Sequence, residues 1–432
     1  MKKILLFSLF LFLAWPCFAQ TQQVLIGGMP SIAMTTASDT YQGLYANADQ
    51  DGYFASFAAS EPNLFPNSGT LRYFRVVLSG APSSGTYTFT INDNNTDTVI
   101  TTGAFSGSSA SDLTHTIHVK AGDLLEIHVH PAGSPTAEEA SWVVDFIPDV
   151  NNEVALGTGQ GNFGTITNGN LIPISVGHGY VAGTGDGPQR VTVVMPCAGT
   201  LTNLYAVSGS ALGSGNSLTF TVVQNGSTTS LSTEIQGTSQ TSNEDTANPI
   251  TISAGDQIYV SVAVGGTVSG IQTGIGATFI PSVPGQFPIM MGNASTQWTN
   301  NANTYNEVSG RPGNEAAAGE SLTEQVSNAM TIQAIYVFTD TAPGSNTKFT
   351  FSLRDNGATP SGGPSCYVGG SSNVTICNSV TGSTGTSGTA TVKNGDLLDT
   401  QIVPTSTPGT QTTGSVSYLA YSSPVGYEKF LK

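Results

Sequence analysis

The sequence predicts an all-β protein made of three tandem antiparallel β-sandwich domains of the jelly-roll type, preceded by a signal peptide. An apolar N-terminal stretch, a repeat of roughly 130 residues and a period-two alternation of apolar and hydroxyl side chains support this prediction. We place the signal peptide at 1–19 and the three modules at 20–149, 150–282 and 283–432.

The first 19 residues have the pattern of a bacterial secretory signal. Lys2 precedes an apolar run, and Ala19 ends a cleavage site of small residues. A retained membrane anchor is disfavoured because about 18 apolar residues are needed to span a bilayer. A lipoprotein anchor at Cys17 is disfavoured because Trp15 and Pro16 stand where small residues are expected. We expect secretion or cell-surface display, with no transmembrane segment in the mature chain.

Composition and net charge limit the kinds of binding partner that the sequence leads us to expect. Charged residues make up 9% of the chain, against about 25% in ordinary soluble proteins. The chain has 12 basic and 28 acidic residues, and removing the two signal lysines leaves 10 against 28, a net charge near −18. Nucleic acid is therefore not an expected partner.

Three aligned segments reveal the repeat. They begin at Gly69, Gly199 and Met330, and each is followed by a strand that alternates apolar and hydroxyl residues, as in Tyr87 to Ile91. This alternation predicts strands with one face toward a core and the other toward water. A turn then interrupts two β-patterned runs in each copy, and its glycine recurs after 133 and 140 residues. The turn glycines are Gly122, Gly255 and Gly395.

The connections and the N-terminus bear on how the modules are arranged. The linkers 149–153 and 282–286 are short, and prolines stiffen the second, so we expect a rod or a compact arc. Val24 to Ile26 can complete the first module or pair with an edge strand of a neighbouring molecule. Pairing within its own module is the favoured alternative.

The segments from Gly199 to Tyr205, Leu218 to Val222 and Ala254 to Asp256, with their counterparts in the other copies, resemble surface modules of bacterial and phage-associated proteins. These share the jelly-roll topology of tumour-necrosis-factor and C1q-like domains. The third copy departs from the pattern at Met330. The resemblance implies surface, fibre or receptor-binding roles and frequent trimerisation, without fixing a ligand.

The cysteines of the exported chain divide into a pair and a single residue. Cys366 and Cys377 are close in sequence, and an oxidising compartment predicts a disulfide between them, with two reduced thiols as the alternative. Cys197 has no evident partner. It can be a buried thiol or form an intermolecular cross-link.

Two groups of residues could bind metal. His118, His128 and His130, together with Glu126, are predicted to point away from the first core, where they could bind a transition metal or form an ordinary solvated face. Asn47, Asp49 and Asp51 repeat the opening of a calcium loop, but its closing glutamate is missing, and an exposed acidic loop is the alternative. The sequence requires no cofactor, and calcium is the ion that its many carboxylates favour most.

No catalytic motif is recognisable, so we expect a protein that is not an enzyme. Trp298 and Tyr305 are candidates for stacking on sugar rings, as are three tyrosines of the first module, although core packing is the alternative for each. The three tyrosines are Tyr41, Tyr45 and Tyr53.

These observations favour a secreted or cell-surface structural and interaction protein that can assemble into a fibre or layer through its sandwich modules. Its expected partners are copies of itself, a neighbouring surface protein or a glycan. A carbohydrate-binding adhesin that uses loop aromatics is the main alternative, and an accessory chain of a hydrolase is a third.

Overall fold

The computed structural model is an all-β protein whose strands form several antiparallel sheets. Its one helical element is a short 3-10 turn, η1 (Pro188–Arg190), and no helix is long and apolar enough to span a membrane; both statements concern the described residues. The structure describes residues 21–29, 32–45, 53–56, 62–158, 169–174, 187–268, 271–291, 298–309, 324–325, 328–370, 375–380, 384–409 and 414–422.

The strands form three pairs of sheets that follow one another along the chain, and we call each pair a lobe. The first lobe contains β1 (Gln23–Met29), β2 (Thr40–Gly43), β3 (Asn63–Leu64), β4 (Gly69–Leu78), β5 (Thr86–Asp93), β6 (Thr96–Thr101), β7 (Ser109–Val119), β8 (Leu124–Ala132) and β9 (Ala140–Pro148).

The second lobe contains β10 (Val154–Thr158), β11 (Leu171–Ile172), β12 (Val193–Val194), β13 (Gly199–Ser208), β14 (Ser217–Gln224), β15 (Ser227–Gln236), β16 (Ser242–Asp245), β17 (Ile250–Ile252), β18 (Gln257–Gly265) and β19 (Thr273–Pro281). The third contains β20 (Gln286–Met291), β21 (Thr304–Asn306), β22 (Glu324–Gln325), β23 (Met330–Thr339), β24 (Lys348–Asp355), β25 (Ser365–Gly369), β26 (Ile376–Asn378), β27 (Gly385–Thr386), β28 (Ala390–Val392), β29 (Leu397–Thr405) and β30 (Gly414–Ser422).

Strand order is equivalent in the three lobes. In the first, one sheet has the order β1-β9-β4-β7 and the other β2-β8-β5-β6, with β3 also paired to β8. The chain thus crosses repeatedly between the two sheets, as in a jelly roll. The second and third lobes repeat this order, with β7 replaced by β16 and β17 or by β26 and β28. The predicted all-β, jelly-roll-like fold class is confirmed.

Alternating burial explains why these segments are strands. In β14 the apolar residues Leu218, Phe220 and Val222 are buried, and the threonines between them are half-buried. One face of the strand can therefore pack on the core while the other contacts solvent. β1 pairs with β9 of its own lobe, from Gln23 to Met29, so the favoured position of the N-terminal strand is correct.

The same side-chain hydrogen bond between two turns occurs at one end of every lobe. Asn94, Asn225 and Asn356 have positive φ in hairpin turns, which asparagine tolerates better than most residues. Each donates through Nδ2 to an aspartate Oδ1 at 2.8 Å. That aspartate follows the repeated turn glycine, whose φ is also positive. The three aspartates, Asp123, Asp256 and Asp396, therefore join two turns of each lobe and are structural.

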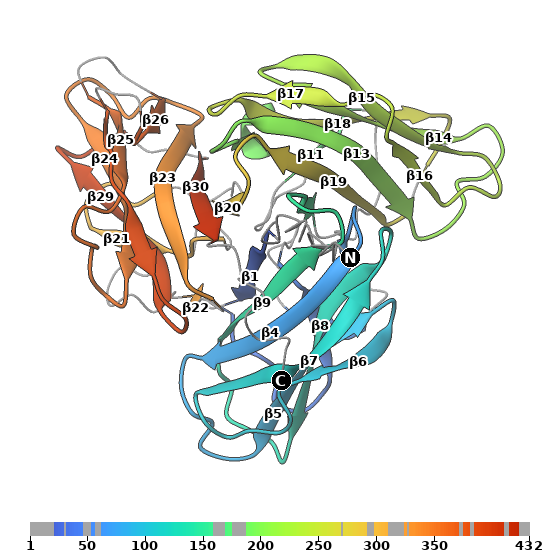
Figure 1. Cartoon of the computed structure of the whole chain (residues 1–432), viewed down its shortest axis with the longest axis horizontal. Helices are drawn as coiled ribbons and strands as arrows, with labels where there is room; N and C mark the ends of the chain where they lie inside the picture. The colour runs from blue at the N-terminus through green and yellow to red at the C-terminus, as the bar shows by residue number, and fades with distance from the viewer. Residues whose placement is uncertain are drawn as a thin grey trace, which may run out of the picture.

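The three lobes close into a ring (Figure 1). β3 contacts β10 and β19 of the second lobe, β12 contacts β23 and β30 of the third, and β22 contacts β1, β4 and β9 of the first. Equivalent strands thus meet at each junction, in the cyclic order first to second, second to third and third to first. The ring has an internal pseudo-threefold arrangement.

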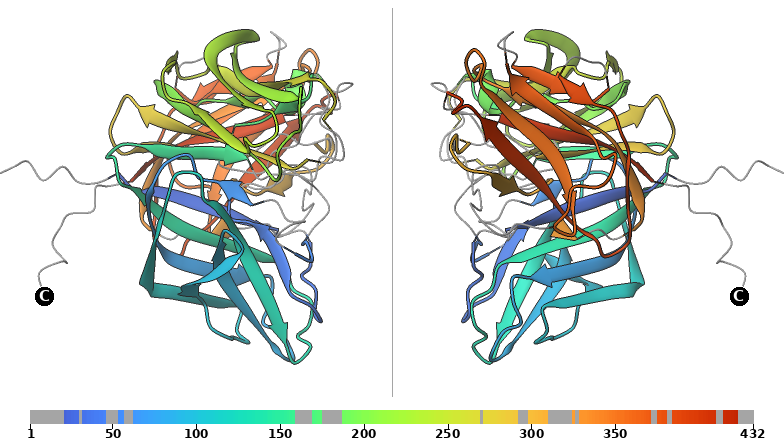
Figure 2. Two further views of the ribbon diagram at one scale, coloured as in Figure 1. Left: turned by 90° about the vertical axis from the view of Figure 1, so that its right-hand side faces the viewer. Right: turned by 90° about the vertical axis from the view of Figure 1, so that its left-hand side faces the viewer.

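The linkers confirm a compact arrangement. Asn152 in the first linker donates to the carbonyl of Pro281 at 2.8 Å and accepts from the amide of Gly285 at 3.3 Å. The two linkers therefore lie together, and the rod, one of the two expected arrangements, is wrong. Figure 2 shows the blue-to-cyan first lobe below the other two, which overlap in both side views.

The predicted disulfide between Cys366 and Cys377 is present, with Cα atoms 5.8 Å apart. Cys366 lies in β25 and Cys377 in β26, which belong to different sheets of the third lobe. Both residues are buried. The bond therefore joins the two layers of the sandwich through its core and does more than close a surface loop.

Candidate functional site

The junctions between lobes are built from equivalent positions. Equivalent strand pairs give the three lobes one common register. Gly69 pairs with Pro148, Gly199 with Pro281 and Met330 with Ser422. The residue two positions before each of these strand starts borders the next lobe around the ring. These residues are Asn67, Cys197 and Asn328.

The junction from the third lobe to the first is sealed by a polar network. Asp145 is fully buried on β9, and its carboxylate accepts hydrogen bonds from Nδ2 of Asn328 and, at 2.6 Å, from Nε2 of Gln22. Arg72 in turn donates to Oε1 of Gln22 at 3.1 Å. The buried carboxylate is thus hydrogen-bonded by both lobes, as a buried charge requires.

The junction from the second lobe to the third is sealed mainly by side chains of low polarity. Cys197 is buried there with Tyr336 nearby, and Leu419 occupies the position equivalent to Asp145. Burial raises the pKa of the Cys197 thiol to about 12, which keeps it protonated and unreactive at neutral pH. Cys197 is thus a buried thiol, the first of the two alternatives.

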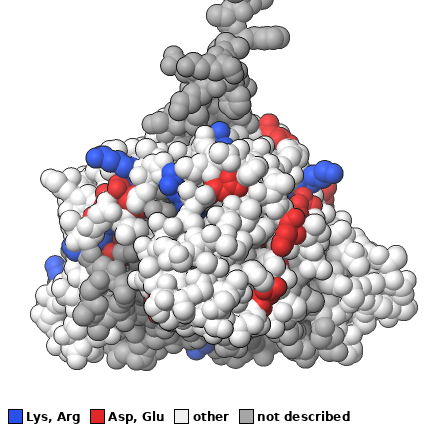
Figure 3. Space-filling model, turned by 90° about the horizontal axis from the view of Figure 1, so that it is seen from below, with Lys and Arg blue, Asp and Glu red and all other residues white. Residues whose placement is uncertain are grey.

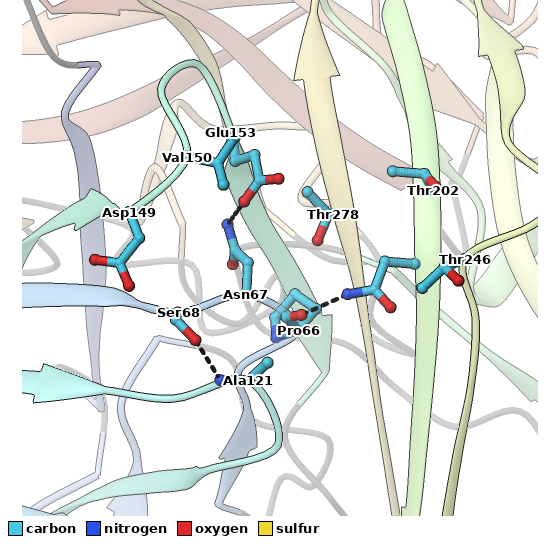
Figure 4. A pocket seen from close by; sticks show the side chains of 11 residues that line it. Pro66, Asn67, Ser68, Ala121, Asp149, Val150, Glu153, Thr202, Thr246 and Thr278 are labelled. Atoms are coloured by element: carbon cyan, nitrogen blue, oxygen red, sulfur yellow. Dashed lines mark hydrogen bonds between the residues drawn. The ribbon is translucent and has the colours of Figure 1, made fainter.

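The junction from the first lobe to the second contains an open cavity of about 480 Å³ (Figure 4). Asn67 Nδ2 donates to Glu153 at 3.2 Å, and Asn203 Nδ2 donates to the carbonyl of Pro66 at 2.6 Å. Thr278 takes the position that Asp145 occupies in the first lobe. Residues lining the cavity include Pro66, Asn67, Val150, Glu153, Asn203 and Thr278.

Three buried oxygens at this cavity have no hydrogen-bond partner: Asn67 Oδ1, Asn203 Oδ1 and Thr278 Oγ1. Asn67 and Thr278 are only 5% and 2% exposed. Buried polar atoms in folded proteins nearly always have a partner, so an orphaned group calls for an explanation. Each of these three oxygens is shielded from solvent, so none is open to the cavity, and unpartnered oxygens of the same kind occur elsewhere, as at Thr233 and Thr273.

Electrostatics at the cavity disfavour anions. Glu153 and Asp149 both line it, and none of its eleven lining residues is basic. Burial raises the pKa of Glu153, the hydrogen bond from Asn67 lowers it, and the nearby charge of Asp149 raises it. The net shift is upward. Two carboxylates and no basic residue in the lining disfavour a negatively charged ligand.

The predicted histidine cluster separates into two places. His118 lies on β7 of one sheet and pairs with Asp149 at 2.8 Å, whereas His128 and His130 lie on β8 of the other sheet. Glu126 is expected on the solvent side with them but is fully buried. The prediction of one cluster is therefore wrong, because the chain crosses between sheets after β7.

His128 and His130 instead form a series of imidazole and carboxylate groups. Asp39 approaches His130 at 2.5 Å and His128 at 3.4 Å, and His128 also pairs with Asp97 at 2.9 Å. Tyr41 stacks on His128 with ring centroids 4.6 Å apart. No group of three metal-ligating side chains suited to a metal occurs in the parts of the chain that the structure describes. The candidate calcium ligands Asn47, Asp49 and Asp51 lie outside those parts.

The predicted sugar-stacking aromatics differ in exposure. Trp298 is only 3% exposed and packs edge-on against Phe349 and Phe351. The prediction of an exposed platform is wrong there, because the indole belongs to the core. Tyr305 is half-buried on β21, accepts a hydrogen bond from Gln401 at 3.1 Å and has Arg354 5.7 Å from its ring centroid. Its role in sugar binding stays a prediction.

Among the other three tyrosines proposed for stacking, Tyr45 is buried in the first core. The sequence interpretation missed the junction residues Asn67, Glu153, Asn203 and Thr278. The repeat alignment offers one signal: Asn67 and Asn328 are equivalent, yet only Asn328 is matched by an acceptor at the Asp145 position.

Comparison with known proteins adds little at this site. No protein-family model and no curated protein matches this chain. Among solved structures, xanthan lyase from Paenibacillus is similar at 14% identity, over 69% of this chain and 30% of that chain, with a TM-score of 0.17. The chain thus spans less than a third of that enzyme, and the likeness is too low to carry an argument.

Proposed function

We propose that the protein is an exported structural and interaction protein whose single chain forms a three-lobed head at the cell surface or outside the cell. The observation that carries this proposal is the cyclic closure of the lobes, in which β3, β12 and β22 each pack on the next lobe. Jelly-roll modules of the group that the repeat resembles often trimerise. In this protein a single chain supplies the three modules that a trimer would take from three chains.

The surface chemistry supports a non-catalytic, interaction role. Figure 3 shows a face on which charged side chains are sparse among neutral residues, in keeping with the 9% charged content of the sequence. Neutral hydroxyl and amide groups keep a β-sheet face hydrated without a strong electrostatic field. Such a face suits contact with other surface molecules.

Assembly into a fibre or layer would use the outer edges of the lobes. β6 and β15 end the strand order of their sheets, and an unpaired strand edge can pair with another chain. Light scattering across a concentration series, followed by electron microscopy, tests this. Concentration-dependent polymers that are lost when lysine replaces Ser230, an exposed residue of β15, would support edge assembly. A strictly monomeric head at every concentration would exclude the fibre and leave the head itself.

A further inference from the structure

We propose that the ring of lobes opens at one place, the third-to-first junction, and that the N-terminal segment (residues 21–29) holds this junction closed. The inference concerns a movement of the head and does not depend on the surface role proposed above. It begins with the order of the lobes in the chain. The first and second lobes are consecutive, as are the second and third, whereas the third and first meet only through non-covalent contacts.

A short linker spans each of the other two junctions. Residues 149–153 connect the first lobe to the second, and residues 282–286 connect the second to the third. A short linker keeps the two faces of a junction at high effective concentration, so they close again after any separation. The third-to-first junction has no such constraint, and it is therefore the place where two lobes can move fully apart.

The N-terminal segment occupies at this junction the place that a linker occupies at the others. By register, Gln23 of β1 is equivalent to Val154 of β10 and Phe287 of β20, the strands that follow the two linkers. Gln22 therefore stands where each linker ends. Ser422, the last residue of β30, donates to the carbonyl oxygen of Gln22 at 2.8 Å. A hydrogen bond thus joins the third lobe to the first where the other junctions have a continuous chain.

The segment has polar contacts with all three lobes and is shielded from solvent. Gln22 and Gln23 are only 2% and 0% exposed. Gln23 forms two hydrogen bonds of 2.9 Å with the backbone of Ala155 in the second lobe. Ser309 of the third lobe donates to the carbonyl oxygen of Ile26 at 2.8 Å. The segment itself is fixed to the first lobe by the pairing of β1 with β9.

Side chains carry the contact between the third lobe and the N-terminal segment. Strand pairing in the described part of the chain stays within each lobe, so no backbone ladder crosses the junction. Proteins open locally where few such contacts must break, while more strongly bonded units stay folded. Loss of the hydroxyls of Ser309 and Ser422 would therefore open the ring at this junction and leave the three lobes folded.

The double variant Ser309→Ala/Ser422→Ala tests the proposal, because it removes both hydroxyls and leaves the N-terminal segment intact. The matched control is Ser415→Ala/Ser417→Ala. These two serines are also buried and lie on β30, and their hydroxyls have no hydrogen-bond partner among the described residues. The control therefore removes two buried hydroxyls from the same lobe without removing a contact to the N-terminal segment.

The measurement is hydrogen exchange of the full protein. In the double variant we expect exchange to be about tenfold faster in residues 21–29 and 304–309, because two hydrogen bonds are lost. Exchange should not change in β10 and β12, which lie at the other two junctions. The control should exchange like the native protein.

Cys197 provides a second readout, because its thiol is buried at the second-to-third junction. It should stay protected from a maleimide in the native protein and in both variants. Equal acceleration of exchange at all three junctions, the same acceleration in the control, a reactive Cys197 in the double variant, or no acceleration at the third-to-first junction would each overturn the proposal.

Discussion

The junction from the third lobe to the first and the junction from the first to the second occupy equivalent places and differ in chemistry. At the sealed junction, Asp145 accepts hydrogen bonds from Gln22 and Asn328. At the open junction, Thr278 stands at the Asp145 position and its hydroxyl has no partner. The repeat therefore specifies where the lobes meet, and single side chains decide whether a junction is closed by a polar network or keeps a cavity.

Asp145→Ala should have the largest effect on stability. It removes the shared acceptor of the buried Gln22 amide and the half-buried Asn328 amide, and breaking such a buried charged network typically costs about 3–4 kcal/mol. We expect the free energy of unfolding, measured by urea denaturation, to fall by that amount. Thr278→Val at the equivalent position of the open junction should change it by less than about 0.5 kcal/mol. Similar losses in both variants would show that the two junctions do not differ as described.

The disulfide extends the comparison to the lobe cores. Cys366 and Cys377 join the two sheets of the third lobe, whereas Thr233 stands at the Cys366 position in the second. Replacing both cysteines by alanine should cost about 2–3 kcal/mol, mainly because the unfolded chain gains freedom. Hydrogen exchange should show the loss within the third lobe. A reductant should destabilise the native protein similarly and leave the double variant unchanged; an effect of reductant on the variant would contradict this.

Asp112 differs from its third-lobe equivalent in a way that predicts acid sensitivity. Burial would raise the pKa of Asp112, but hydrogen bonds from the amides of His115, Thr114 and Thr101 and from the His115 ring lower it to about 2. Asp245 accepts backbone hydrogen bonds in the same way at the equivalent position of the second lobe, and Ser379 stands at that position in the third lobe.

Because the folded pKa lies below the unfolded value, the stabilisation is complete above pH 4 and is lost as the pH falls toward 2. We expect Asp112→Ser to cost about 2 kcal/mol at neutral pH and progressively less in acid. Urea denaturation of both proteins at several pH values measures the difference. A cost that does not change with pH would show that the carboxylate charge is not responsible.

The fold could be predicted from the sequence because its cause is local and repeated. The alternation at Leu218, Phe220 and Val222 follows from one face of a strand packing on a core, and the same cause produces it three times. The disulfide was predictable because, of the three cysteines after residue 19, only Cys366 and Cys377 are near one another in the sequence. The ring was not, because linker stiffness does not determine direction and the contact between Asn152 and Pro281 involves distant residues.

The cavity at the first-to-second junction could not be predicted from the sequence for a related reason. Asn67 and Thr278 are 211 positions apart in the sequence and belong to different lobes, so no local pattern links them. Their importance depends on the lack of a partner, which only three-dimensional packing reveals. The predicted cluster of His118 and His128 was wrong for the opposite reason. These residues are close in sequence, but the chain crosses between the sheets after β7 and places them in different sheets.

Asp93 gives a small expected gain in stability, and its equivalents in the other lobes test the comparison between lobes once more. Burial and the nearby charge of Asp123 raise the pKa of Asp93 to about 6, although Lys120 lowers it. In the second lobe Gln224 takes this position and donates to Asp256 at 2.6 Å. Because the folded pKa of Asp93 lies above its unfolded value, stability declines as the pH rises from about 4 through 6.

Asp93→Gln should remove that decline and give the first lobe the hydrogen bond of the second. We expect a gain of less than about 1 kcal/mol at pH 8 and none near pH 4, measured by urea denaturation at both values. Gln224→Glu is the reciprocal variant and should lose stability as the pH rises. A stabilisation by Asp93→Gln that is equal at both pH values would show that the repulsion between Asp93 and Asp123 is not its source.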